Sequence, residues 1–379
     1  MIARVVFWGS LGLLVYAYLL YPVLAGIFGT VLARRVRRDG VSPMVSLLIP
    51  AYNEEEVLPA KLTNSLSLEY PKDRLEVVVA SDGSTDRTCA VAASFADRGV
   101  RLLAFPERGG KAALLNRAVP QLLGEVVVFT DASCLLDRRA LRRLVSNFAD
   151  PVVGAVCGRY RFVAKTSSGR SGGEGAYWQF EAWLKRMEGA LSSILGAHGA
   201  LYAIRRFLFQ PLPDGAINDD YLIPMRVVEQ GYRAIYDESA VAEELTDATT
   251  RGELSRRTRI TVGNYQQTIW LWRLLNPFRG WIAWQFFSHK VLRTLTPVFL
   301  IALLGSSVAL MQEPLYAAVF AAQGIFYGMA IVGAQCEQRG RPIGLFMVPF
   351  YFSLANLAAL LGLLKFLLRA QRPAWEKVR

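Results

Sequence analysis

The chain has 379 residues, of which 20 % are charged and 53 % are hydrophobic, and its formal net charge is +12. The charged fraction is below the roughly 25 % of typical soluble domains, which disfavours a purely water-soluble protein. The positive charge does not indicate nucleic-acid binding, because no recognised nucleic-acid-binding motif accompanies it.

The first predicted element is a membrane anchor. Residues 5–33 contain no charged side chain over 29 positions, and a bilayer core needs about 20 apolar residues. A signal peptide is disfavoured, because its apolar core is usually only about 7–15 residues long. The anchor is followed directly by Arg34, Arg35, Arg37 and Arg38. By the positive-inside rule the block after them is cytoplasmic, which predicts a multi-pass protein of the inner (plasma) membrane.

The block that follows alternates apolar strands with amphipathic helices. Strands are predicted at 45–49, 75–80, 100–104 and 125–130, and helices at 57–66, 87–96, 111–122 and 221–230. Such alternation is typical of an α/β fold with a mainly parallel sheet covered on both faces. Residues 165–175, rich in glycine and serine, are predicted to form a loop.

Polar residues follow three of these strands at the point where each strand ends. Asp82 comes after the second strand, Asp131 after the fourth, and residues 50–54 after the first. Because ligands bind beyond the carboxyl ends of parallel strands, we expect these groups to share one crevice. An aspartate after a strand can instead close a turn or cap a helix, and its position makes capping a strong alternative for Asp86.

Carboxylates in such a crevice would repel a phosphate group unless a cation lay between them. Mg²⁺ and Mn²⁺ prefer oxygen ligands and are often held by a carboxylate together with substrate phosphates. One such carboxylate would hold Mg²⁺ or Mn²⁺, and the ion would neutralise a leaving diphosphate. Lys111 would add a positive charge near that group. The four cysteines show no CxxC spacing, so neither a disulfide framework nor a zinc site is expected.

Four motifs together resemble a known family. PAYNEE (50–55), VVVASDGSTDRT (77–88), GGKAALLNRA (109–118) and FTDAS (129–133) occur in the order and spacing of the membrane-bound family 2 glycosyltransferases. That family includes the cellulose, chitin, hyaluronan and poly-N-acetylglucosamine synthases, and the likeness extends over about residues 45–265. The resemblance implies a Rossmann-like GT-A catalytic domain that uses a nucleoside diphosphate sugar and inverts the anomeric centre.

The resemblance also implies roles for individual residues of the nucleotide-sugar site. Ala51, Tyr52, Glu54 and Asp82 match positions that hold the uracil and ribose, and Lys111 matches a position near the diphosphate. Asp131 matches the first acid of the DxD metal motif, whereas the second acid is replaced by Ser133. One carboxylate oxygen of Asp131 would then ligate the ion, with the nucleotide supplying further ligands.

The second half resembles the acceptor side of these enzymes. His198 and Gly199, in GAHGALYAIRR, match the segment that contacts the acceptor sugar, although the histidine could also only hydrogen-bond locally. Asp219 and Asp220 resemble the Glu-Asp pair whose aspartate is the catalytic base. A sugar hydroxyl needs such a proton acceptor, and a neighbouring carboxylate can raise the pKa of the base. We therefore assign Asp220 as the base and Asp219 as its neighbour; a helix N-cap would explain only one of them.

RRTRI, at 256–260, takes the place of the QxxRW motif of processive synthases. Arg257 and Arg259 are expected to grip the leaving diphosphate, and basic residues beside a membrane surface are the alternative. The tryptophan of the motif is replaced by Ile260, which removes an aromatic platform for the acceptor and weakens an assignment of long-chain processivity.

The C-terminal third is predicted to be a membrane bundle. Aromatic and basic residues mix between 265 and 290, which is typical of helices in the membrane interface. Apolar runs follow at 294–312, 314–335 and 343–364. Three crossings would leave the basic tail outside, whereas the positive-inside rule places it inside, so a re-entrant or interfacial late segment and a different number of crossings both remain open.

These observations give three predicted regions: an anchor at 1–40, a cytosolic GT-A domain at 41–263, and interfacial and transmembrane helices at 264–379. The leading functional hypothesis is transfer of a hexose or N-acetylhexosamine from a UDP-sugar to a growing polysaccharide. The alternatives are single-sugar transfer to a polyprenyl phosphate or another lipid, and a non-catalytic membrane subunit that binds nucleotide. The expected partners are a UDP-sugar, a glycan or lipid acceptor and the bilayer, without nucleic acid.

Overall fold

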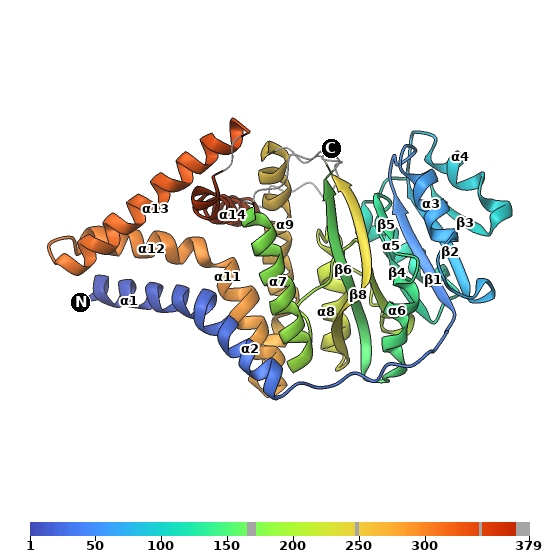
Figure 1. The fold of residues 1–379 in the computed structure, drawn as a ribbon, viewed down its shortest axis with the longest axis horizontal. Helices are drawn as coiled ribbons and strands as arrows, with labels where there is room; N and C mark the ends of the chain where they lie inside the picture. Colours follow the sequence, from blue (N-terminus) through green and yellow to red (C-terminus); the bar gives the residue numbers. More distant parts are fainter. Residues whose placement is uncertain (165–171, 247–249, 341–342, 369–379) are drawn as a thin grey trace.

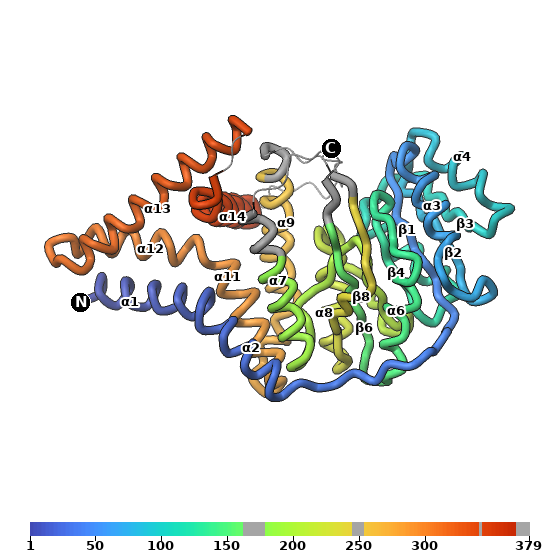
Figure 2. The backbone as a smooth tube through the Cα atoms, in the orientation of Figure 1, coloured from blue at the N-terminus to red at the C-terminus, as the bar shows by residue number. Residues whose placement is uncertain are grey.

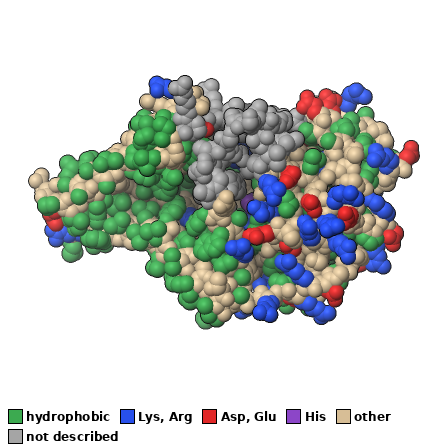
Figure 3. All heavy atoms as spheres, in the orientation of Figure 1, with side chains coloured by type: hydrophobic (Ala, Val, Ile, Leu, Met, Phe, Trp, Pro, Cys, Tyr) green, Lys and Arg blue, Asp and Glu red, His purple; other side chains and the backbone are tan. Residues whose placement is uncertain are grey.

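The computed structural model describes residues 1–164, 172–246, 250–340 and 343–368. An α/β domain forms one side of the molecule and a set of long helices forms the other (Figure 1). The surface divides in the same way: hydrophobic side chains cover the long helices, and Lys, Arg, Asp and Glu gather over the α/β domain (Figure 3).

One mixed eight-stranded sheet organises the α/β domain, in the order β3-β2-β1-β4-β7-β6-β8-β5. The strands are β1 Val45–Ala51, β2 Leu75–Asp82, β3 Val100–Phe105, β4 Val126–Phe129, β5 Cys134–Leu136, β6 Val153–Ala164, β7 Tyr202–Arg205 and β8 Arg233–Thr246. β3, β2, β1 and β4 are parallel, as the sequence predicts. β7 then runs antiparallel to β4 and to β6, whereas β6 and β8 pair in parallel.

Both faces of the parallel half are covered, because neighbouring residues of each strand alternate between two apolar layers. Leu48 of β1 belongs to a layer with α5 Lys111–Ala118 and α8 Asp219–Glu229. Leu47 and Ile49 point the other way, toward α6 Ala140–Ser146 and toward α3 Leu58–Leu66 with α4 Thr88–Ala93. This double burial is why the strands read as continuous apolar runs.

The N-terminal helix is continuous over Ile2–Val31 and comprises α1 Ile2–Val15, a π-helical turn Tyr16–Leu20 and α2 Tyr21–Val31. The segment between α2 and β1 runs beneath the sheet (Figure 2). It is held there by the Arg34 amide, which donates to the Ala190 carbonyl at 2.8 Å, and by the Arg37 amide, which donates to the Asp150 carboxylate at 3.2 Å.

Two helices join the sheet to the long helices. α7 Gly172–Leu191 packs along α2, and α9 Thr250–Trp270 packs along α14 Gly344–Leu367. Residues 165–171 of the predicted loop lie outside the described residues. The prediction of a loop for 172–175 is wrong, since the chain is already helical from Gly172.

Among the described residues, three helices are long and apolar enough to cross a membrane: Ile2–Val31, α13 Pro314–Gln338 and α14. A fourth candidate is a bent pair, in which the helix Trp281–Thr294 meets α12 Thr296–Ala309 at 59°. α12 has only 14 residues, a length of about 21 Å. It packs along α1, and Arg4 of α1 pairs with Glu313 after α12 at 2.6 Å.

A buried polar cluster ties the long apolar helices to the α/β domain. Glu188 of α7 accepts a hydrogen bond from the Tyr21 hydroxyl of α2 at 2.5 Å and lies 2.6 Å from Nδ1 of His289. His289 belongs to a π-helical turn, η9 Phe286–Val291. One turn on, Arg293 pairs with Glu181 of α7 at 2.7 Å. We call Tyr21, Glu181, Glu188, His289 and Arg293 the junction cluster.

Candidate active site

Two of the predicted carboxylates converge on one ammonium group. Nζ of Lys111 lies 2.9 Å from Oδ1 of Asp131 and 3.2 Å from Oδ1 of Asp219. The three residues come from the start of α5, the end of β4 and the start of α8. Burial lowers the pKa of Lys111, but the carboxylates of Asp131, Asp219 and Asp220 more than offset this, so the pKa is raised above its usual value. Lys111 is therefore charged, and it links Asp131, the predicted metal ligand, to Asp219, the neighbour of the predicted catalytic base.

Asp220 completes this group of acids. Its Oδ2 accepts a hydrogen bond from the Gly199 amide at 2.9 Å, and the Gly199 carbonyl accepts one from the Asp131 amide at 3.2 Å. Gly199 thus touches both acids. A Cβ atom at this position would lie 2.8 Å from Oδ2 of Asp131, so the close approach requires glycine.

The two neighbouring aspartates have different surroundings. The carboxylate of Asp219 is engaged by Lys111 and by the Tyr202 hydroxyl at 3.3 Å. Burial and the negative charge of Asp219 raise the pKa of Asp220 to about 6, although Lys111 opposes the shift. A carboxylate with a raised pKa is a better proton acceptor. The roles of base for Asp220 and neighbour for Asp219 remain predictions, which this geometry supports.

Asp82 binds the loop that precedes Lys111. It is fully buried, and its two oxygens accept hydrogen bonds from the amides of Gly109 and Gly110, each at 2.8 Å. Gly110 has a φ of 82°, which disfavours any residue with a Cβ. Asp82 therefore fixes the turn from which Lys111 starts α5. Its predicted contact with the nucleoside remains a prediction.

Tyr52 and Glu54 follow β1 at the same edge of the sheet, and Ala51 is buried at the end of that strand. The Arg108 guanidinium stacks over the Tyr52 ring, 3.9 Å from its centroid. This arrangement places a flat cation–π pair beside the Gly109–Gly110 turn. The nucleotide roles of Ala51, Tyr52 and Glu54 remain predictions, and Arg108 is an additional residue that the motifs did not single out.

The N-cap of α4 is Arg87, so the capping role expected for Asp86 is wrong. Asp86 instead joins two turns. Its Oδ1 accepts a hydrogen bond from the Thr88 amide at 2.9 Å, and its Oδ2 accepts one from the Glu55 amide at 3.2 Å.

α9 brings Arg259 to the acids. Arg259 interacts electrostatically with Asp220, Asp219 and Asp131. Arg257 lies on the same helix and its carbonyl accepts from the Thr261 hydroxyl at 2.8 Å. The Ile260 carbonyl accepts from the Asn218 side chain at 2.9 Å. Grip on a diphosphate by Arg257 and Arg259 remains a prediction.

His198 lies beside these acids and is paired with a lysine. Its Nε2 is 3.0 Å from Nζ of Lys185 on α7. Burial, together with the charges of Lys185 and Lys290, lowers the pKa of His198 well below its usual value. The ring is therefore neutral, and Nε2 accepts from the ammonium, which can only donate. The acceptor-binding roles of His198 and Gly199 remain predictions.

Lys61 on α3 holds the turn that carries Asp131, and the sequence did not predict this role. It is fully buried, and its ammonium donates to the Thr130 hydroxyl at 2.7 Å and to the Cys134 carbonyl at 2.5 Å. These two residues flank the Asp131-Ala132-Ser133 turn. Burial lowers the pKa of Lys61 to about 8. A lysine among apolar helix positions normally indicates a solvent-exposed face, so the sequence carries little signal for this contact.

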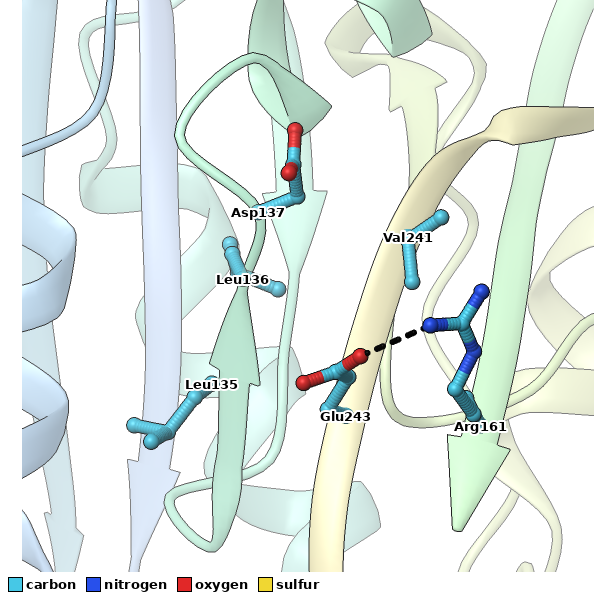
Figure 4. Close-up of a pocket in the computed structure, with 6 residues that line it drawn as sticks. All are labelled: Leu135, Leu136, Asp137, Arg161, Val241 and Glu243. Carbon is cyan, nitrogen blue, oxygen red and sulfur yellow. Dashed lines mark hydrogen bonds and ion pairs between the residues drawn. The ribbon is translucent and has the colours of Figure 1, made fainter. Parts of the chain in front are cut away.

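A separate cavity of about 220 Å³ lies between β5, β6 and β8 (Figure 4). It is lined by Leu135, Leu136, Asp137, Arg161, Val241 and Glu243. Two of these residues, Arg161 and Glu243, form an ion pair at 3.1 Å. None of the predicted site residues lines this cavity, so we place the chemistry at the acids around Lys111.

A divalent cation would find few protein ligands here. No group of three or more His, Cys, Asp or Glu residues that could hold a metal occurs in the part of the chain that the structure describes. The Asp131 carboxylate is one-third exposed, with a side-chain accessibility of 33 %. An exposed carboxylate fits a cation that takes its remaining ligands from a diphosphate and water.

Several known proteins resemble this chain in sequence, and a solved structure resembles it in fold. A β-monoglucosyldiacylglycerol synthase from Synechocystis sp. is 27 % identical over 307 residues, covering 76 % of this chain and 63 % of that protein. A poly-β-1,6-N-acetyl-D-glucosamine synthase from Staphylococcus aureus is 26 % identical over 227 residues, covering 59 % of this chain and 55 % of that protein. This chain thus spans less than two thirds of the length of either relative.

Among solved structures, a mannosyltransferase from Pyrobaculum calidifontis in complex with GDP-Man and Mn²⁺ matches with a TM-score of 0.74 at 25 % identity. The match covers 98 % of this chain and 99 % of that one, so it includes the long helices. The glycosyl transferase family 2 model matches residues 46–212, which hold Asp82, Lys111 and Asp131. The chain therefore carries a family 2 glycosyltransferase domain with the GT-A fold, as its four motifs predict.

Proposed function

We propose that this chain transfers a sugar from a nucleoside diphosphate sugar to a hydroxyl group of a membrane lipid, with inversion at the anomeric carbon. The observation that carries the proposal is the pair of inequivalent aspartates. Asp219 is neutralised by Lys111 at 3.2 Å, while Asp220 is held by one backbone amide and has a pKa of about 6. This pair provides a base beside a site for a charged leaving group.

On the donor side, the chain offers positive charge where a diphosphate would leave. Lys111 and Arg259 both lie near Asp131, and Tyr52 with Arg108 offers a flat surface for a nucleobase. The sequence resemblance favours uracil, whereas the Pyrobaculum enzyme holds GDP-Man. Both UDP- and GDP-sugars therefore belong in the donor screen.

A bound Mg²⁺ or Mn²⁺ would supply charge neutralisation for the departing diphosphate. Asp131 would hold the ion, and Lys61 keeps the turn that carries Asp131 in place. The Pyrobaculum enzyme contains Mn²⁺, which supports the same requirement here.

The base is positioned by the chain itself. Gly199 donates to Oδ2 of Asp220, which leaves Oδ1 to accept the proton of the attacking hydroxyl. Inversion requires that hydroxyl to approach the anomeric carbon from the side opposite the diphosphate. Asp220 would serve the side of the hydroxyl, and Lys111 would serve the side of the diphosphate. Proton transfer by such a base contributes about 10²–10⁴-fold to the rate.

We favour a lipid acceptor because of the elements around the base. Ile260 replaces the aromatic platform of processive synthases, and α7, α9 and the helix Trp281–Thr294 connect the site to the membrane helices. Polysaccharide extension is the second candidate, and the similarity to the Staphylococcus synthase favours it. The length of the product separates the two.

The test uses the full chain in nanodiscs, labelled UDP- and GDP-sugars, and mass spectrometry of the products. We expect a one-sugar adduct on lipid, with turnover lost in excess chelator. Asp220→Asn should reduce transfer by about 10²-fold or more while nucleotide binding stays intact. A polymer product would support the second candidate. Nucleotide binding without any transfer by the unaltered chain would support a non-catalytic subunit and contradict the proposal.

A further inference from the structure

Three basic side chains meet close to Asp220, on or beside elements that pack against the long apolar helices. Nζ of Lys185 lies 3.0 Å from Nε2 of His198. Lys290, in the π-helical turn η9, lies over the Tyr221 ring, 4.8 Å from its centroid. Both ammonium groups interact electrostatically with His198 and with each other. We call Lys185, His198 and Lys290 the basic trio.

The two ammonium groups of the trio have no contacting counter-charge. Among the residues that the structure describes, no carboxylate lies within 4.0 Å of either ammonium. The nearby carboxylates of Glu181 and Glu188 are already engaged inside the junction cluster, by Arg293 at 2.7 Å and by His289 at 2.6 Å. Both lysines are partly buried, and two partly buried cations held close together are costly unless an anion joins them.

Two members of the trio lie next to residues that contact or adjoin Asp220, the proposed base. His198 directly precedes Gly199, whose amide binds Asp220, and Lys290 stacks on Tyr221, which directly follows Asp220. The thiol of Cys157 interacts electrostatically with both Lys185 and Asp220, which places these two groups in one neighbourhood. An anion bound by the trio would therefore lie next to the hydroxyl that Asp220 activates.

The elements that carry the trio also face the membrane helices. Lys185 lies on α7, which packs along α2, and Lys290 lies on the helix that continues toward α12. Mobile lysine side chains bind phosphate as point charges, without a required geometry. A phosphate on a lipid at the membrane surface matches this position.

We propose that the basic trio binds a phosphate group of the acceptor lipid and so places the acceptor hydroxyl at Asp220. This deepens the proposed function and rests on it. The shared chemistry is a phosphate monoester or inorganic phosphate, and the experiment separates a lipid source from a soluble one.

The test measures acetylation of individual lysines by mass spectrometry on the full chain. In detergent, inorganic phosphate is added; in nanodiscs, phosphatidylcholine is compared with phosphatidylcholine containing phosphatidic acid. We expect phosphatidic acid to slow acetylation of Lys185 and Lys290 several-fold. Lys72, whose exposed side chain donates to the Leu66 carbonyl, is the internal reference and should not change.

Protection by inorganic phosphate alone would assign the trio to a soluble phosphate, and protection by phosphatidic acid confirms the lipid source. Equal acetylation in every condition would overturn the proposal. Variants provide a second measurement. Lys290→Met should raise the KM for the acceptor by about tenfold or more, as expected for loss of one charge-assisted hydrogen bond. Lys290→Arg keeps the positive charge, so its KM should stay close to that of the unaltered chain. Arg273→Gln, at an exposed site, is the charge-matched control.

The two proposals fail in different ways. Absence of sugar transfer by the unaltered chain would contradict the proposed function. The acetylation experiment would still test whether the basic trio binds a phosphate group. Normal transfer with an unchanged acceptor KM in Lys185→Met and Lys290→Met would reject the anion site and leave the transferase in place.

Discussion

At the scale of single residues, the site is controlled by the way charge is shared among three aspartates and one lysine. Lys111 contacts Asp131 and Asp219 but reaches Asp220 only through longer-range attraction. Since Asp220 is also partly buried, its pKa rises to about 6 while its neighbour stays paired. One aspartate can therefore exchange a proton near neutral pH, and the pair acts as an asymmetric unit.

This asymmetry predicts the pH dependence of transfer. Because the base works only when it is ionised, kcat should increase as the pH rises through about 6 and then level off. Asp219→Asn removes a negative charge that raises the pKa of Asp220, so the acidic limb should move to lower pH. The measurement is a pH–rate profile of both forms with one nucleotide sugar. An unchanged limb in Asp219→Asn would show that another group titrates.

A second prediction concerns Lys61. Methionine has a side chain of similar length without the buried ammonium. Its substitution relieves the cost of burying a charge but leaves the Cys134 carbonyl without this donor, so the melting temperature should change little. The turn that carries Asp131 loses two hydrogen bonds. We therefore expect Mn²⁺ affinity, measured by electron paramagnetic resonance, to fall by about tenfold.

The control for this variant is Ser65→Ala, one turn along α3. The Ser65 hydroxyl donates to the Lys61 carbonyl within the helix and does not touch the turn. It should leave Mn²⁺ affinity unchanged. Equal losses in both variants would mean that α3 as a whole, and not the ammonium, supports Asp131.

At the scale of elements, the site depends on a short turn between α7 and β7. Gly199 donates to Asp220 and accepts from Asp131, so one residue fixes the spacing between the predicted base and the predicted metal ligand. Neither α8 nor β4 could set this distance alone.

Gly199→Ala should therefore separate the two acids. The added Cβ would lie 2.8 Å from Oδ2 of Asp131 and push that carboxylate aside. A displacement of about 1 Å can reduce the rate by about 10²-fold, so we expect kcat to fall by this factor while the protein stays folded. Gly231→Ala is informative as a fold control, because its Cβ meets no atom within 4 Å although its φ of 93° introduces strain.

The elements also show what a sequence can predict. β1 to β4 and their helices follow from alternating apolar and polar segments, and the grouping of Asp131 with Lys111 follows from the rule that parallel strands place their carboxyl ends together. The antiparallel strand β7 and the long pair β6 and β8 were not predicted, because their pairing joins distant segments. The roles of Asp82 and Lys61 in holding turns were also missed, since both depend on three-dimensional burial.

At the scale of the whole molecule, α14 bears on the open question of how often the chain crosses the membrane. Figure 1 shows α1 and α12 extended across the view, whereas α14 is seen end-on. α14 packs on α9 of the α/β side: the Tyr265 hydroxyl donates to the Ala359 carbonyl at 3.4 Å, and Thr261 approaches Gly362. These contacts favour α14 lying along the membrane interface, which reconciles the basic tail with the positive-inside rule.

This arrangement predicts the side on which two positions react. In a chain with Cys89 and Cys336 replaced, a cysteine at Lys365 of α14 should react with an impermeant maleimide only from the side of the α/β domain. A cysteine at Glu313, beyond α12, should react only from the opposite side. Labelling of intact and inverted vesicles measures this. Reaction of both positions from one side would contradict the arrangement.

The junction cluster has a consequence for acceptor choice. Because Tyr21, Glu188 and His289 bind one another across α2, α7 and η9, the anchor and the α/β domain cannot slide independently. If the chain acts on a membrane lipid as we propose, this connection would keep Asp220 at a constant height above the lipid headgroups. The enzyme would then select acceptors by the distance of their hydroxyl group from the glycerol backbone, and it would reject hydroxyls that lie closer to the backbone or farther from it.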